Sequence, residues 1–238
     1  MVLIKLYLLT SWTSPSNSQG VRDGNDAPEA AENTSERTLD VTPAYNSDLD
    51  LCNQLPNPSV IDDLVGVYFD CCNWVYRNVN ERAFMAAWAS YKSGTGSDRI
   101  VLATVCMIMA LVILYLPTGH DLLCALPPDS EALFYKIMHV ALERKQAEGR
   151  RAYSLELVEL LLIRVHYLMT SKIDHEELWR VLGEVVNTAT AMGLHRDPGK
   201  EVLSEVAERR RWAWWNIIAL ERYVNGGIYP VFSSPNFL

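Results

Sequence analysis

The sequence predicts an all-α fold, arranged as a multi-helix bundle or an irregular helical stack. After residue 58, apolar side chains recur every three to four residues along most of the chain, which is the spacing of amphipathic helices. No stretch alternates polar and apolar residues between hairpin turns, as strands would. Hydrophobic residues make up 49% of the 238 residues, which is enough for a core of packed helices.

The first 58 residues are predicted to form a disordered acidic leader, and residues 59–238 the folded helical domain. Residues 10–58 are rich in Ser, Asn, Asp, Pro and Gly and show no apolar period. The leader holds eight acidic residues against three basic ones, and the whole chain carries a formal net charge of -8. This acidity disfavours direct binding to a phosphate backbone.

Two helices are expected in the first part of the domain. Ser59 with Asp62 three residues later resembles a capping box, and apolar residues then continue at helical spacing to Val75. Phe84 and Trp88 share one face of a second helix, which we expect to end at the glycines of residues 94–96.

The seventeen residues from Ile100 to Leu116 carry no charge. Asp98 can cap a helix over this stretch, and Pro117 stops it. The length is at the lower limit of what crosses a bilayer, so a single membrane span at residues 100–116 is one reading. We favour the other, a helix buried in the core.

Four further helices are predicted, with short connectors between them. Asp129 or Ser130 can cap the first, which Gly149 ends; the second runs from Ser154 to Met169; Asp174 with Glu177 opens the third, which Gly193 ends in a left-handed conformation; the fourth runs from near Ser204 to Gly226.

The sequence indicates neither a catalytic residue nor a metal ligand. The five cysteines are odd in number and form no C-x-x-C pair, so we interpret them as mostly buried free thiols without a zinc site. No G-x-S-x-G, Walker or G-x-G-x-x-G motif occurs, and the five histidines lie on unrelated elements. A small enzyme with a site assembled in space stays open as an alternative.

Three arginines directly precede three tryptophans in the last predicted helix. Arg209, Arg210 and Arg211 follow the acidic Glu201, Glu205 and Glu208, which weaken any local positive field. We therefore interpret the arginines as partly buried, paired groups at the edge of a core rather than as phosphate contacts.

This region also carries a resemblance to a known family. GLHRDP (residues 193–198), followed by ERRRWAWWNIIALER (residues 208–222), resembles the middle homology region of fungal zinc-cluster transcription factors. LVGVYFDCCNWVYRNVNERAFMAAW (residues 64–88) is similar to that family's opening helix. The site residues implied by the resemblance are Gly193, Leu194, His195, Arg196, Asp197, Pro198, Arg209, Arg210, Arg211, Trp214, Trp215, Glu221 and Arg222.

The resemblance implies an all-helical regulatory domain in a nuclear protein that regulates transcription. Its expected partners are proteins of the transcription machinery or a second copy of the chain, and a small-molecule effector is possible. In this family DNA is bound by a separate N-terminal module, in which six cysteines hold two zinc ions. No residue here corresponds to that module, so neither zinc nor DNA binding is assigned to this chain.

The sequence also departs from the family pattern near its C-terminus. Glu221-Arg222 replaces an Asp-Arg pair, and residues 226–230 replace a Gly-Arg-Pro turn without its arginine. The chain then ends at Leu238, so we expect a truncated or divergent member with exposed apolar surface. A stand-alone protein-interaction module is the remaining alternative.

Overall fold

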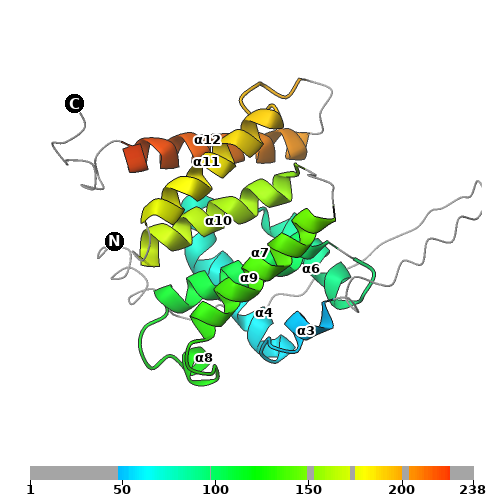
Figure 1. Cartoon of the computed structure of the whole chain (residues 1–238), viewed down its shortest axis with the longest axis vertical. Coiled ribbons are helices and arrows are strands. Elements are labelled where there is room, and N and C mark those ends of the chain that lie inside the picture. The colour runs from blue at the N-terminus through cyan, green and yellow to red at the C-terminus, as the bar shows by residue number, and fades with distance from the viewer. Residues whose placement is uncertain (1–47, 97, 149–152, 172–174, 200–203, 226–238) are drawn as a thin grey trace, which may run out of the picture. The chain divides into compact units, whose positions relative to one another are not determined.

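A computed structural model describes residues 48–96, 98–148, 153–171, 175–199 and 204–225 (Figure 1). Every regular element in these ranges is a helix, which confirms the predicted all-α class. The elements are α3 (Leu49–Cys52), α4 (Pro58–Val67), the π-helix η1 (Tyr68–Asn73), α5 (Trp74–Tyr76), α6 (Glu81–Lys92), α7 (Arg99–Tyr115), α8 (Asp121–Cys124), α9 (Ser130–Ala147), α10 (Leu155–Ser171), α11 (His175–Ala191) and α12 (Ser204–Asn225).

Some predictions fall on residues outside these ranges. They are the leader up to residue 47, the helix end at Gly149, the cap at Asp174 and the altered turn of residues 226–230.

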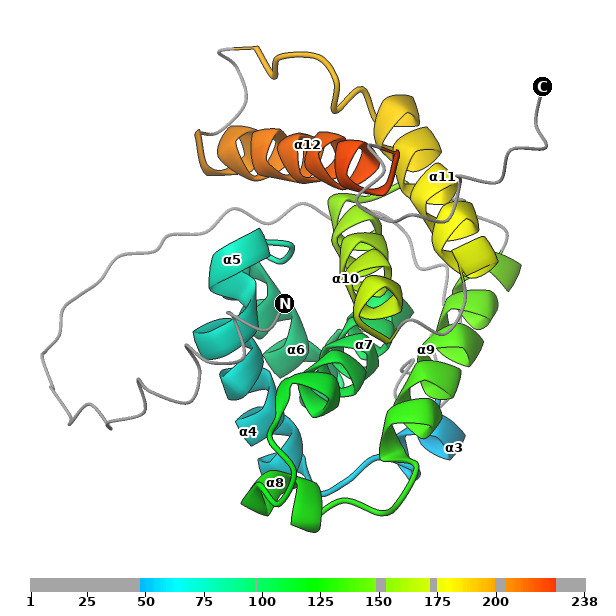
Figure 2. The ribbon, with the colours of Figure 1, turned by 90° about the vertical axis from the view of Figure 1, so that its left-hand side faces the viewer.

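Helix α7 is the central element of the fold. It packs against α4 and α6 on one side and against α9 and α10 on the other (Figures 1 and 2). Its residues from Ile100 to Val112 are all buried, because neighbouring helices surround the whole circumference. The core-helix reading is thereby confirmed. Within the described ranges, no helix has both the length and the apolar character that a bilayer crossing requires.

The remaining helices build outwards from this centre. Helix α10 packs against α7 and also contacts α11 and α12, so it links the core to the C-terminal pair. Both views place α12 at the end of the fold opposite to α8 (Figures 1 and 2). Helices α11 and α12, the C-terminal pair, are therefore joined to the core through α10.

One predicted helix cap is confirmed by its hydrogen bond: the Asp98 carboxylate accepts from the Ile100 N–H at 3.0 Å. Ser154, predicted only as the start of a helix, also acts as a cap, since its hydroxyl accepts from the Leu157 N–H at 3.2 Å. Each satisfies a backbone donor that lacks a partner within its helix.

Two other predicted caps are wrong. Helix α4 is capped by Asn57, whose side chain accepts from the Ser59 N–H at 3.1 Å, so Ser59 lies inside the helix. At α9, Asp129 has a φ of +64° and makes no side-chain cap. The Ser130 hydroxyl instead donates to the Pro127 carbonyl at 2.6 Å.

The helix predicted to continue to Val75 is interrupted by the π-helix η1. Its wider turns end the regular helical spacing at Tyr68. Asn73, at the end of the π-helix, makes two hydrogen bonds to the following loop. Its side-chain N–H₂ donates to the Val79 carbonyl at 3.0 Å, and its side-chain oxygen accepts from the Val79 N–H at 3.2 Å. Local hydrogen bonding of this kind cannot be read from an apolar period.

The described fold also begins before the predicted start at residue 59. Helix α3 lies within the segment assigned to the leader, and its Leu51 is buried in the main core. Asp48, just before α3, is buried as well. Its partners lie on α7 and α9, far along the chain, so composition alone did not reveal them.

A buried histidine in this core gives the chain a pH-dependent stability. His166 of α10 lies against the ring of Tyr76, with centroids 4.2 Å apart, and its Nε2 is 2.7 Å from the Tyr115 hydroxyl. Burial lowers the pKa of His166 to about 4, from 6.5. The native state therefore holds His166 neutral where the unfolded chain would protonate it.

We expect stability to fall as the pH decreases from about 6.5 towards 4, since the unfolded state then binds more protons. Between pH 6.5 and 5, His166 should account for a loss on the order of 1 kcal/mol. Urea unfolding of the wild type and of His166→Gln at both pH values measures this contribution. Equal losses in the two proteins would contradict the assignment.

Candidate functional site

A cleft of about 1350 Å³ lies among α9, α10 and α11. Its walls carry aromatic and charged side chains as well as apolar ones. They include Tyr135, His139, Arg164, Tyr167, Glu177, Trp179 and Arg180. This mixture of aromatic walls and a few converging polar groups is typical of a small-molecule site.

Arg164 is the centre of the polar cluster in the cleft. Its side chain is only 2% exposed, although it belongs to the apolar helix α10. The guanidinium donates to His139 Nε2 at 2.8 Å and to the Tyr135 hydroxyl at 3.3 Å, and it forms an ion pair with Glu177. These three acceptors compensate for the loss of water around a buried charge.

Aromatic stacking shapes the wall beside Arg164. The rings of Tyr135 and Tyr167 are stacked, with centroids 4.8 Å apart. The Tyr167 hydroxyl donates to the Glu131 carboxylate at 2.6 Å. Because each ring is held at both its face and its edge, this wall is pre-organised.

The ionisation of the cluster follows from these contacts. Burial, and then the charge of Arg164, lower the pKa of His139. The histidine ring is therefore neutral and accepts a hydrogen bond from the Arg164 guanidinium. A hydrogen bond from Arg180 is the main cause that lowers the pKa of Glu177. The cleft thus contains opposite charges already paired with one another, an arrangement suited to binding and packing.

The GLHRDP segment directly follows α11. Gly193 has a φ of +67°, which confirms the predicted left-handed helix end. Leu194 is buried, whereas His195, Arg196 and Asp197 are exposed and Pro198 is half-buried. The segment therefore anchors the end of α11 through one leucine and presents its charged residues to solvent.

The three arginines of α12 each bind a different partner. Arg209 forms a bidentate pair with Glu159 of α10, at 2.6 and 2.8 Å. Arg210 donates to the Met192 carbonyl at 3.0 Å, at the end of α11. Arg211 reaches Asp197 at 2.9 Å. Together they connect α12 to α10, to α11 and to the GLHRDP segment.

The two tryptophans of the family motif differ in burial. Trp214 is half-buried and lies 6.0 Å from the His195 ring, but Trp215 is 64% exposed. Trp214 packs against the core, whereas Trp215 lies outside it. Glu221 and Arg222 are exposed near the end of α12. A functional role for the family-motif residues stays a prediction.

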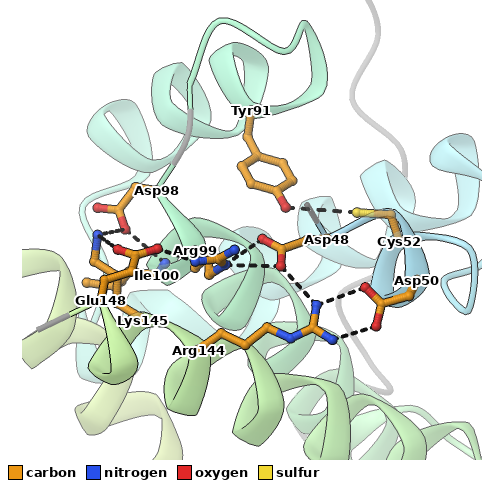
Figure 3. Close-up of polar contacts among 10 residues, drawn as sticks. All are labelled: Asp48, Asp50, Cys52, Tyr91, Asp98, Arg99, Ile100, Arg144, Lys145 and Glu148. Carbon is orange, nitrogen blue, oxygen red and sulfur yellow. Dashed lines mark hydrogen bonds and ion pairs between the residues drawn. The ribbon is translucent and has the colours of Figure 1, made fainter. Parts of the chain in front are cut away.

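A second polar cluster holds the start of the described chain in place (Figure 3). The fully buried Asp48 carboxylate accepts from Arg99 of α7 at 2.8 and 3.0 Å. It also accepts from Arg144 of α9 at 3.0 Å, and Arg144 in turn pairs with Asp50 at 2.5 Å. We call Asp48, Asp50, Arg99 and Arg144 the ionic clamp.

The five cysteines differ in burial and in reactivity. All five cysteines are free, as predicted. Only Cys72 and Cys106 are buried, while Cys52 and Cys71 are half-buried and Cys124 is exposed, so the prediction that most are buried is wrong. Burial raises the pKa of Cys72 to about 12 and also raises the pKa of Cys106, so neither is a thiolate near neutral pH. Within the described part of the chain, no three His, Cys, Asp or Glu side chains gather to hold a metal ion.

The cleft residues were missed by the sequence analysis. Glu177 was read only as part of a helix start, and His139 as an isolated histidine. The available signal was Arg164 itself, a charge inside the run LLLIRVHYL of α10. Such a residue requires a buried partner.

The fold and the cleft define an all-helical domain with a paired, pre-organised polar site. The sequence matches the model of the fungal specific transcription factor domain over residues 65–225, more than half of the chain. The chain belongs to this family, which confirms the resemblance found in the sequence.

A curated relative also matches the chain. The chain is 26% identical over 188 residues to "Transcription factor FBD3" of Gibberella moniliformis (strain M3125 / FGSC 7600). The alignment covers 76% of this chain and 24% of that protein, so the chain spans about a quarter of its relative's length. No solved structure matches significantly.

Proposed function

We propose that this chain is the regulatory domain of a nuclear fungal transcription factor and is not an enzyme. The observation that carries the proposal is the family match, which extends from α4 to the end of α12 and so spans most of the described fold. The unreactive buried thiols and the mutually paired charges of the cleft support a non-catalytic role. DNA and zinc binding belong, in this proposal, to a separate module.

The domain would act by packing against partners or by binding an effector. Proteins of the transcription machinery or a second copy of the chain are the proposed partners. A small effector would bind the cleft and change the packing of α11 on α10, since both helices line it. Such an effector must bind one packing state better than another.

Tethering tests this function. We expect the full chain, fused to an unrelated DNA-binding domain, to change reporter transcription several-fold relative to that domain alone. Unchanged transcription from a stable, nuclear fusion would overturn the proposal.

Gly183 offers a cleft-specific arm of the same experiment. A Cβ at this position meets no heavy atom within 4 Å, and the residue lines the cleft. Gly183→Phe should therefore occupy part of the cleft and alter reporter output, whereas Gly183→Ala should leave reporter output unchanged. Identical reporter output from both variants would show that the cleft has no role in regulation.

A further inference from the structure

A second, smaller groove lies between residues 73–81 and the first half of α12. Its volume is about 510 Å³. Its walls carry two exposed indoles, those of Trp74 (57% exposed) and Trp212 (41% exposed). We call it the indole groove. Figure 2 shows α5, which carries Trp74, beside α12.

The walls of the indole groove are fixed by hydrogen bonds. The Trp74 indole N–H donates to the Cys71 carbonyl at 3.1 Å, which sets the orientation of an otherwise exposed ring. From α12, the Asn216 amide donates to the Tyr76 carbonyl at 2.6 Å. Exposed aromatic rings held in this way lose little conformational entropy when a partner binds.

The charge of the groove is negative. Four carboxylates line it, and one of them, Glu159, forms an ion pair with Arg209. Glu205 has only a distant, exposed pairing with Arg82 at 3.9 Å. Glu81 and Glu208 form no ion pair with any residue in the described ranges. These carboxylates line the same groove as the two indoles, whose faces attract cations.

One indole of the groove already makes a cation–π contact with a side chain of the protein itself. The Arg77 guanidinium lies 4.8 Å from the centroid of the Trp212 ring. Arg77 has a φ of +46°, a conformation that L-residues seldom adopt. The contact shows which chemistry the Trp212 face accepts, while Trp74 has no cation over it among the described residues.

We propose that the indole groove binds a segment of a partner protein that carries a Lys or Arg side chain. The cation would lie on the Trp74 ring and pair with Glu81 or Glu208, and Arg77 would compete for the Trp212 face. This interaction surface is separate from the cleft. Of the three family-motif arginines, Arg209 lines it, and that arginine is already paired with Glu159. The proposal stands independently of the regulatory function.

The test uses two peptides that differ only in charge. The probe is acetyl-Gly-Arg-Leu-Arg-Gly-amide, and its control has citrulline, the uncharged analogue, in place of each arginine. They are titrated into the full chain with ¹⁵N-labelled indoles, and Trp74→Phe and Trp212→Phe assign the two signals. We expect the arginine peptide to shift both signals and the citrulline peptide to shift neither.

Three variants locate the binding. Glu208→Gln should raise the Kd of the arginine peptide about threefold through loss of one exposed charge pair. Glu221→Gln, on the same helix but outside the groove, should leave Kd unchanged. Arg77→Gly suits the left-handed backbone and frees the Trp212 ring, so it should tighten binding several-fold.

Several results would overturn the proposal. Equal shifts with the citrulline peptide would show that the charge of the arginines does not matter for binding. An unchanged Trp74 indole signal on addition of the arginine peptide would show that the peptide binds elsewhere. Shifts that depend on protein concentration without peptide, and vanish in Trp74→Phe, would assign the groove to a second copy of the chain.

Discussion

Replacement of Asp48 by asparagine should lower the free energy of unfolding by about 3 kcal/mol, because it breaks a buried charge pair. The Asp48 side chain is fully buried and accepts from both Arg99 and Arg144. Asparagine has the same shape, but it removes the charge and presents an N–H₂ donor to guanidinium donors. Urea unfolding at pH 7 measures the loss.

Asp50→Asn is the matched control within the ionic clamp. Asp50 pairs with the same Arg144, yet its side chain is 56% exposed, so water replaces the lost contact. We expect a much smaller loss of stability than for Asp48. Similar losses at both positions would mean that burial of Asp48 is not what stabilises the clamp.

The clamp also shows why the start of the fold was predicted too late. Residues 48–58 mix polar residues and prolines with scattered leucines, and α3 is a single short turn, so neither composition nor periodicity distinguishes them from a linker. What holds them is Leu51 in the core and the pairing of Asp48 with two arginines on distant helices. Long-range ion pairs of this kind leave no local pattern.

The helices themselves could be predicted because their apolar spacing is local. The buried α7, the Asp98 cap and the Gly193 end all follow from neighbouring residues. The π-helix could not be predicted in this way, since neither its wider turns nor the Asn73–Val79 hydrogen bonds that follow it leave an apolar period. Local rules therefore predicted the element types better than their junctions.

The candidate site divides in the same way. The family motif could be found in the sequence, because its residues lie within one stretch from Gly193 to Arg222. The cleft could not, because Tyr135, Arg164 and Glu177 come from three helices and meet only after these have packed. Only the isolated charge of Arg164 in an apolar helix signalled it.

The second large effect is expected at the pair between Arg209 and Glu159. Arg209→Met should lower the free energy of unfolding by about 3 kcal/mol at pH 7, since it leaves a buried carboxylate without its partner. Glu159 is 5% exposed, and both its oxygens accept from Arg209. Arg211→Met is the control: its pair with Asp197 is exposed, so the loss should be below about 1 kcal/mol.

The pH dependence of Arg209→Met distinguishes a lost charge partner from lost packing. Burial already raises the pKa of Glu159, and the hydrogen bond and charge of Arg209 oppose that rise. Without Arg209 the pKa rises further, so the native state binds a proton more tightly than the unfolded chain does. The contribution of Glu159 to stability then increases as the pH falls, because protonation removes the buried charge. Urea unfolding should therefore show the deficit relative to wild type shrinking from pH 7 to 5. A deficit that stays constant over this range would assign the effect of Arg209 to packing of its side chain alone.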